Sequence, residues 1–515
     1  MLNLRPQLQN LLDSADQKQD PADQNEEKIT VSSATKRIAF AYERFRNTLE
    51  PDEADILRRK AIARILKRRL EEGRPSPVIA EQLLQELIRA NYIKNVTKKF
   101  ARHIAAKLER TQQIRLHLSP AVAAWFLDIV SVSIDRELFP WRHEEMLVAL
   151  MYKDTYARVE WTDNLVKEAD RPTQLYMACH RALIEADDNE IAFHYFVHHF
   201  PEWSHPEFNT VSLNRLISGI PEFYAKIQTS LYHPARDRLT KILRPVAVPY
   251  RIIRDIIQRE PQAFNSTDTL DQAVRETVSW RARKLRNRMS KRAWHSILFL
   301  FITKTVIALL VEVPYEVFLL LRFSWLALWV NIAFHPLLLF ILTTTVRLPD
   351  TANTNRIVEE VSKIVTGEEI MSTLIISRTR TYGALTWSFF TLVYIVLFLG
   401  IFWGLFSMLA LLEFSLIAML IFVMFLGLVS FLAIRIRHSV NQIRIIAPRE
   451  GAIGSIFTFI SLPILEFGRW LAQKISQINI FLFFMDRVLE APFKILIDVV
   501  EEWFTFVRDR REEIV

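Results

Sequence analysis

Residues 384–434 have the sequence ALTWSFFTLVYIVLFLGIFWGLFSMLALLEFSLIAMLIFVMFLGLVSFLAI, and this stretch decides the fold class. Its 51 residues contain one charged side chain, Glu413, whereas a helix that crosses a bilayer needs about 20 apolar residues. A surface helix of a water-soluble protein is apolar along one stripe and polar on the opposite face. The stretch therefore predicts two membrane-spanning helices, at about 385–412 and 415–434, joined by a tight turn. Together they form a transmembrane hairpin over residues 384–435.

A second apolar region, residues 293–346, precedes the first and is less uniform. Four charged residues interrupt it: Lys304, Glu312, Glu316 and Arg322. Their positions favour another transmembrane hairpin, with spans at 293–311 and 323–346 and an external turn that carries the two glutamates. The alternative places one or both of these helices in the membrane interface.

Basic residues set the predicted orientation of both hairpins. Seven of them lie just before the first span, where we expect them to meet the membrane surface: Arg281, Arg283, Lys284, Arg286, Arg288, Lys291 and Arg292. More follow the fourth span, whereas the short turns carry mainly glutamate. The positive-inside rule then places both termini, and the connector at 347–383, in the cytoplasm. We therefore predict a multi-pass protein of the cell membrane.

The rest of the chain predicts helices. Only 10 of the 515 residues are glycine, against about 7% in average proteins, so folds built on glycine turns are disfavoured and an all-α fold is expected. Residues 1–32 are acidic and poor in apolar residues, which predicts a disordered tail. Residues 33–292 show helical periodicity broken by prolines, which predicts a large helical cytoplasmic domain.

The C-terminal residues 436–515 predict membrane-proximal amphipathic helices in the cytoplasm. Segment 453–471 has a proline in its middle, Pro463, and is expected to be interfacial or re-entrant. Between residues 478 and 507 acidic and basic residues recur every four positions. This mainly acidic stripe favours packing on protein over docking on lipid, because interfacial helices usually carry a basic polar face.

Three polar residues fall at membrane depth in the first hairpin: Lys304, Asn331 and His335. Asn331 and His335 are four residues apart and share one helix face. Ionisable groups inside a membrane are costly and often functional, so one interpretation is a proton or ion path. The other is that Lys304 extends toward Glu312 or Glu316 while Asn331 and His335 bond neighbouring helices. The second interpretation is favoured, because a proton or ion path would need more polar residues along its walls than these helices contain.

Two further patterns suggest helix contacts and metal binding. Gly400 and Gly404 have the GxxxG spacing that lets two helix backbones approach closely, between hairpins or between copies of the chain. Glu190, His194 and His198 recur every four residues, which would place two or three metal ligands on one helix face. They match no known metal-binding motif, and aromatic neighbours favour structural histidines.

The segment 55–72 is a basic amphipathic helix with seven lysines and arginines. A solvated face is the favoured interpretation, because acidic residues flank it on both sides. The alternative is contact with anionic lipid headgroups or an acidic partner. The single cysteine, Cys179, excludes an intrachain disulfide and a cysteine-based zinc site.

No hydrolase, kinase, nucleotide-binding or redox motif is present, and no cofactor is indicated. The leading hypothesis is a non-enzymatic, membrane-anchored interaction or scaffold protein whose cytoplasmic domain recruits partners. One alternative is a subunit of an oligomeric channel or transporter that uses the polar residues of the first hairpin. Another is a membrane-bound metalloenzyme centred on the Glu190 segment. The expected partners are the lipid bilayer, proteins that bind the cytoplasmic domain and a second copy of the chain; nucleic acid is disfavoured because no binding module matches.

Overall fold

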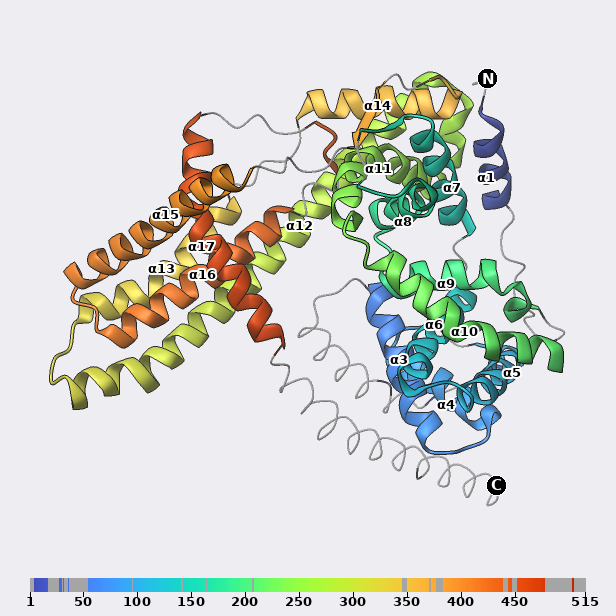
Figure 1. The fold of residues 1–515 in the computed structure, drawn as a ribbon, viewed down its shortest axis with the longest axis horizontal. Helices are drawn as coiled ribbons and strands as arrows, with labels where there is room; N and C mark the ends of the chain where they lie inside the picture. Colours follow the sequence, from blue (N-terminus) through green and yellow to red (C-terminus); the bar gives the residue numbers. More distant parts are fainter. Residues whose placement is uncertain are drawn as a thin grey trace, which may run out of the picture. The chain divides into compact units, whose positions relative to one another are not determined.

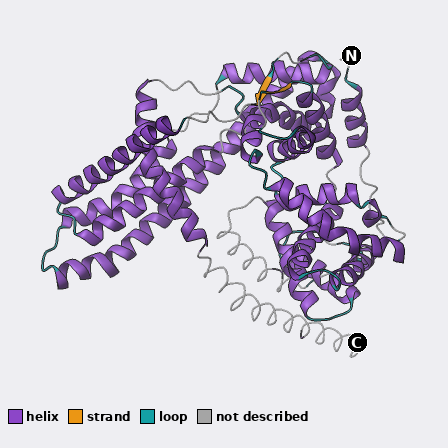
Figure 2. Ribbon diagram, in the orientation of Figure 1, coloured by secondary structure: helices purple, strands orange, loops and turns teal. Residues whose placement is uncertain are grey.

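The structure, a computed structural model, is almost entirely helical (Figure 2). It describes residues 4–16, 27–29, 31, 36, 54–94, 96–139, 142–162, 165–205, 208–344, 350–369, 372–376, 383–438, 443–446, 452–477 and 503. The predicted all-α class is confirmed. The chain divides into two compact units. The N-terminal unit consists mainly of Pro6–Val159 and Asn164–Leu243, and the C-terminal unit mainly of Glu160–Asp163 and Arg244–Leu482.

The N-terminal unit is a bundle of helices around an aromatic core. Its α-helices and 3-10 turns are α1 (Pro6–Asp16), α3 (Ala54–Glu71), α4 (Ser76–Arg89), α5 (Lys98–Arg115), α6 (Pro120–Leu138), α7 (Arg142–Tyr156), η1 (Glu168–Asp170), α8 (Arg171–Leu183), α9 (Asp188–His199), η2 (Pro201–Ser204) and α10 (Thr210–Leu231). Asp187 and Asn209 begin α9 and α10 by accepting backbone N–H groups three residues ahead, which satisfies donors that lack a helical partner. Phe126, Phe196 and Trp203 meet at the centre, with ring centroids 5.5–5.9 Å apart.

The expectation of a disordered tail over residues 1–32 does not hold for α1. Leu8 and Leu11 of this helix are buried, and α1 packs against α7. These leucines lie three residues apart on one helix face, so a short acidic segment can still bury an apolar edge. Ile29 is also buried, beside a short bridge between Lys28 and Thr97.

The C-terminal unit contains the apolar helices (Figure 1). In chain order its elements are α11 (Arg236–Arg259, shared with the N-terminal unit), η3 (Pro261–Asn265), α12 (Thr267–Ile307), the π-helical turns η4 (Ala308–Glu312) and η5 (Tyr315–Leu319), α13 (Trp325–Thr344), α14 (Thr351–Thr366), α15 (Ala384–Leu411), α16 (Leu416–His438) and α17 (Ala452–Gln477). The strands β1 (Val159–Trp161) and β2 (Leu374–Ile376) pair in a two-stranded sheet. The units divide within α11, so the composition change at residue 292 is not a boundary between them.

Four helices of the described residues are long and apolar enough to span a membrane: Thr267–Leu319, Trp325–Thr344, Ala384–Leu411 and Leu416–Ala433. They indicate a membrane protein. The first of them, Thr267–Leu319, is one continuous helix. It begins at a Ser266–Thr269 capping box, and α12 continues without a break through both π-helical turns. α13 packs against α12, α16 packs against α13, and α17 packs against α16.

The prediction that Glu312 and Glu316 lie in an external turn is wrong. Both glutamates lie within the helix, and the turn consists of residues 320–324. Pro314 lacks a backbone N–H and would normally interrupt an α-helix. Here it keeps helical backbone angles between the two π-helical turns, whose wider hydrogen-bonding pattern lets the helix continue past it.

Asn353 of the connector helix α14 binds the segment that follows α16. Asn353 donates from Nδ2 to the backbone oxygen of Ile443 (3.0 Å), and its Oδ1 accepts from the N–H groups of Ile445 (2.8 Å) and Ile446 (3.1 Å). α14 also packs on α12, where Arg275 donates to Asn355. The segment that follows α16 is therefore fixed to the connector by hydrogen bonds between the Asn353 side chain and its backbone.

Candidate functional site

The polar residues of the first hairpin form one buried cluster. The Nζ of Lys304 on α12 donates to the side-chain oxygen of Asn331 on α13, and the Nδ2 of Asn331 donates to the Glu312 carboxylate. Lys304 and Asn331 are 0% exposed and Glu312 is 2% exposed. Asn331 thus bridges two opposite charges of the neighbouring helix. The hydrogen bonds join α13 to α12 and to η4, which holds these helices together.

The second hairpin closes this cluster. The ammonium of Lys304 lies over the rings of Phe422 and Phe425 on α16, 5.6 and 4.9 Å from their centroids. His335, also buried, has its Nε2 3.0 Å from the backbone oxygen of Phe422 and its Nδ1 3.4 Å from that of Asn331. A neutral imidazole has one N–H, and the shorter contact to Phe422 is the better geometry. His335 therefore connects α13 to α16.

Two features of the cluster go beyond simple helix pairing. The Oε1 atom of Glu312 is buried and has no hydrogen-bond partner among the described residues. Glu316, 7% exposed, lies one turn further along the same helix. π-Helical turns occur often at functional sites, and both glutamates lie in such turns. The site can therefore accept a proton or a cation at one carboxylate oxygen.

The GxxxG glycines make no close contact with the described part of the chain. A Cβ added at Gly400 or Gly404 would meet nothing within 4 Å, so this face of α15 is open. The close helix contact lies elsewhere, at Gly427 on α16 and Gly468 on α17. A Cβ at Gly427 would lie 2.8 Å from Phe467 and 3.2 Å from the Gly468 backbone, and one at Gly468 would overlap the Gly427 carbonyl. Segment 453–471, which we expected to be interfacial or re-entrant, lies within the continuous helix α17. This helix packs on α16.

Gly468→Ala should destabilise the C-terminal unit by about 1–3 kcal/mol, because the added methyl group must push α16 and α17 apart. The measurement is the unfolding midpoint of the full-length protein in mixed micelles of mild detergent and SDS. Gly400→Ala is the matched control and should leave the midpoint unchanged or raised, since its methyl group enters open space. Equal midpoints for the two variants would contradict the close contact.

The three candidate metal ligands have separate surroundings. The carboxylate of Glu190 is 2% exposed and bonds Arg59 on α3 and Arg136 on α6. His194 contacts Tyr176, and His198 is exposed. No group of three histidine, cysteine or acidic residues that could hold a metal ion occurs in the described part of the chain. The carboxylate is engaged by two guanidinium groups, which leaves it poorly placed to bind a metal.

Three arginines of the basic helix α3 are buried, contrary to the expectation of a solvated face. Arg58 pairs with Asp135, Arg59 with Glu190, and Arg69 with Glu86 at 2.7 Å. All three arginines are 5–7% exposed. The helix therefore directs part of its charge inward, where bidentate guanidinium contacts can satisfy buried carboxylates. Sequence periodicity within α3 does not indicate these pairs, because the acidic partners lie on other helices, 17 to 131 residues away in the sequence.

A histidine and tyrosine cluster lies beside this network. The hydroxyl of Tyr176 lies 3.0 Å from Nε2 of His194, and the Tyr176 ring contacts His180 with centroids 4.7 Å apart. Neither ring nitrogen of His180 has a hydrogen-bond partner among the described residues. Burial lowers the pKa of His180 to about 3, and His194 and Arg136 add to the shift. Burial also raises the pKa of Cys179, which keeps this thiol protonated and unreactive.

The stability of the N-terminal unit should fall as the pH drops below about 6.5, the ordinary pKa of histidine. The unfolded chain then binds a proton at residue 180 that the folded chain does not bind, so stability is lost at about 1.4 kcal/mol per pH unit toward pH 3. Hydrogen exchange of α8 peptides, corrected for intrinsic rates, measures this. His180→Phe should flatten the dependence between pH 7 and 5, whereas the exposed-site variant His198→Gln should retain it. A steep dependence in His180→Phe would contradict the assignment.

The predicted membrane-surface cluster is divided in the structure. Arg281 makes a bidentate contact with Asp255 of α11 (Nε to Oδ2 2.5 Å, Nη2 to Oδ1 2.8 Å). Five other members are exposed on α12: Arg283, Lys284, Arg286, Arg288 and Lys291. The side chain of Arg292 lies outside the described atoms. Arg281 is thus a structural residue, and the exposed five keep the charge available to a membrane surface.

Comparison of the whole chain with protein-family models, curated proteins and solved structures finds no match.

Proposed function

We propose that the chain is a non-enzymatic, membrane-anchored interaction protein. In this proposal the apolar helices form a multi-pass anchor in the cell membrane, both termini face the cytoplasm, and the N-terminal unit recruits partner proteins. The observation that carries it is the internal pairing of Lys304, Asn331 and Glu312. Polar groups that bond each other between helices stabilise an anchor, whereas a transport path needs polar groups that face an aqueous cavity.

The N-terminal unit supports this division of roles. It has its own aromatic core and its own buried arginine–carboxylate contacts. The exposed basic residues at the start of the first apolar helix favour a cytoplasmic location for the adjoining chain. A helical unit with a separate core, held beside the membrane, can present a fixed surface to soluble proteins.

The test is the mass of the intact complex in nanodiscs, with cross-linked and co-purifying proteins identified by mass spectrometry. The proposal expects a soluble protein in constant ratio to the chain, cross-linked to the N-terminal unit. Deletion of residues 33–243 should release it, provided that the shortened chain still inserts into the membrane. If that deletion leaves every associated protein and the cellular phenotype unchanged, the proposal fails.

A channel or transporter subunit is the second candidate, favoured by one observation. The buried Oε1 of Glu312 has no partner among the described residues, and an unsatisfied carboxylate oxygen in an apolar site can bind a proton or cation. Such a protein would assemble as an oligomer, since four helices rarely enclose a pore, and α15 with its open glycine face would be available for contact with a second copy.

Ion flux in reconstituted vesicles tests this candidate. Full-length protein should conduct or exchange a cation or proton, and both Glu312→Gln and His335→Ala should abolish the flux while the protein remains folded and inserted. Absence of flux across a panel of monovalent cations, divalent cations and protons would count against it and leave the anchor.

A further inference from the structure

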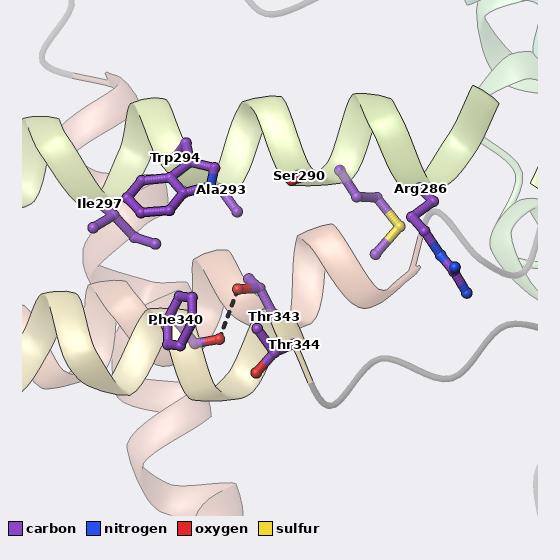
Figure 3. Close-up of a pocket in the computed structure, with 9 residues that line it drawn as sticks. Arg286, Ser290, Ala293, Trp294, Ile297, Phe340, Thr343 and Thr344 are labelled. Carbon is purple, nitrogen blue, oxygen red and sulfur yellow. Dashed lines mark hydrogen bonds between the residues drawn. The ribbon is translucent and has the colours of Figure 1, made fainter. Parts of the chain in front are cut away.

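A pocket of about 290 Å³ lies between α12 and α13, away from the Lys304 cluster (Figure 3). Arg286, Ser290, Trp294 and Ile297 line it in that order along one face of α12, at spacings of three to four residues. Phe340 and Thr343 of α13 form the facing wall. Figure 3 shows the guanidinium of Arg286 at the opposite end of the pocket from the ring of Trp294.

The pocket changes from polar to apolar along the helix axis. Eleven residues separate Arg286 from Ile297, which is about 16 Å at the rise of an α-helix. Trp294 and Phe340 have ring centroids 6.3 Å apart and are both partly exposed. Tryptophan is enriched where the hydrocarbon of a bilayer meets its headgroups. The pocket therefore has the length and polarity of a phospholipid headgroup with the upper part of one acyl chain.

The polar end is basic and available. Arg286 is exposed and has no ion-pair partner among the described residues, unlike Arg281, which Asp255 engages. The exposed Arg283 and Lys291 lie close by in the sequence and increase the positive potential. Thr343 donates its hydroxyl to backbone oxygens of Leu339 and Phe340, and Thr344 donates to that of Ile341. Arg286 and Ser290 are therefore the side-chain donors on the polar side of Trp294.

We propose that this pocket binds one anionic phospholipid. The guanidinium of Arg286 and the hydroxyl of Ser290 hold the phosphate, and an acyl chain lies against Trp294, Ile297 and Phe340. A planar guanidinium matches a phosphate with two parallel hydrogen bonds. The basic neighbours favour a lipid with net negative charge over a zwitterionic one. The inference requires α12 and α13 to lie in a membrane, but it does not depend on partner recruitment.

The test is native mass spectrometry of the full-length protein in mild detergent, titrated with dioleoylphosphatidylglycerol or dioleoylphosphatidylcholine. One phosphatidylglycerol should bind at least tenfold more tightly than phosphatidylcholine. Arg286→Gln should weaken that first binding event about tenfold, as expected for loss of a charge-assisted contact. Arg283→Gln removes the same charge outside the pocket and should weaken it less than twofold. Ser290→Trp, which fills the pocket at an exposed position, should abolish it.

Three results would overturn the proposal. If Arg286→Gln and Arg283→Gln weaken binding equally, lipid affinity depends on the total positive charge of this surface and not on a contact with Arg286. If Ser290→Trp binds as the unmodified chain does, the pocket is not the site. If inorganic phosphate at millimolar concentration displaces phosphatidylglycerol, the site recognises a free oxyanion and not a lipid. Retention of the bound lipid in phosphate, with the expected order of variants, supports the assignment.

Discussion

Lys304→Met should destabilise the C-terminal unit by roughly 3–5 kcal/mol, the usual cost of removing one member of a buried charge pair. The substitution keeps a similar volume but leaves Glu312 without its nearby positive charge. Asn331 then loses the donor that bonds its side-chain oxygen, so a buried acceptor becomes unsatisfied beside an uncompensated carboxylate. The unfolding midpoint in mixed micelles containing SDS should fall well below that of the unmodified protein.

The double variant Lys304→Met with Glu312→Gln is the control for charge pairing. It removes both charges, while the amide oxygen introduced at position 312 can still accept from Asn331, so most of the lost stability should return. Replacement of a buried ion pair by neutral groups is often close to neutral in stability. A double variant no more stable than the single variant would show that Lys304 acts through packing on the aromatic rings of α16.

Glu190→Ala should destabilise the N-terminal unit by roughly 3–5 kcal/mol. The carboxylate lies between the buried Arg59 and the half-buried Arg136, and its removal leaves these two positive charges to repel each other. Asp187 also contacts Arg59, at 3.1 Å, so part of the charge of Arg59 stays compensated in the variant. Hydrogen exchange of peptides from α3, α6 and α9 in the full-length protein should show faster opening of all three helices.

Lys98→Ala is the matched control for this prediction. Lys98 also pairs with a carboxylate, that of Glu27, but both side chains are exposed. Exposed pairs contribute little because water and salt screen them, so exchange should not change. A metal role for Glu190 would instead predict a loss of bound metal with little change in exchange rates, which elemental analysis of the purified protein would detect.

The sequence predicted the membrane helices because bilayer insertion depends on composition over about 20 residues, which is a local property. Residues 384–434 met that condition without reference to any other part of the chain, and the four helices of the structure agree. The polar residues Lys304, Asn331 and His335 were also identifiable, since a charge inside an apolar run is visible in one dimension. In the same way, helical periodicity and scarce glycine predicted the all-α class.

Only the tertiary structure decided which partners these residues have. Asn331 bonds both Lys304 and Glu312 because the helix continues past Pro314 and Glu312 lies beside α13. In a sequence, proline usually indicates that a helix ends. The buried arginines of α3 pair with acids 17 to 131 residues away, and Gly427 meets Gly468 while the more conspicuous GxxxG stays open. Hydrogen bonds, ion pairs and close backbone contacts form between distant segments, so their partners are set by packing and not by local pattern.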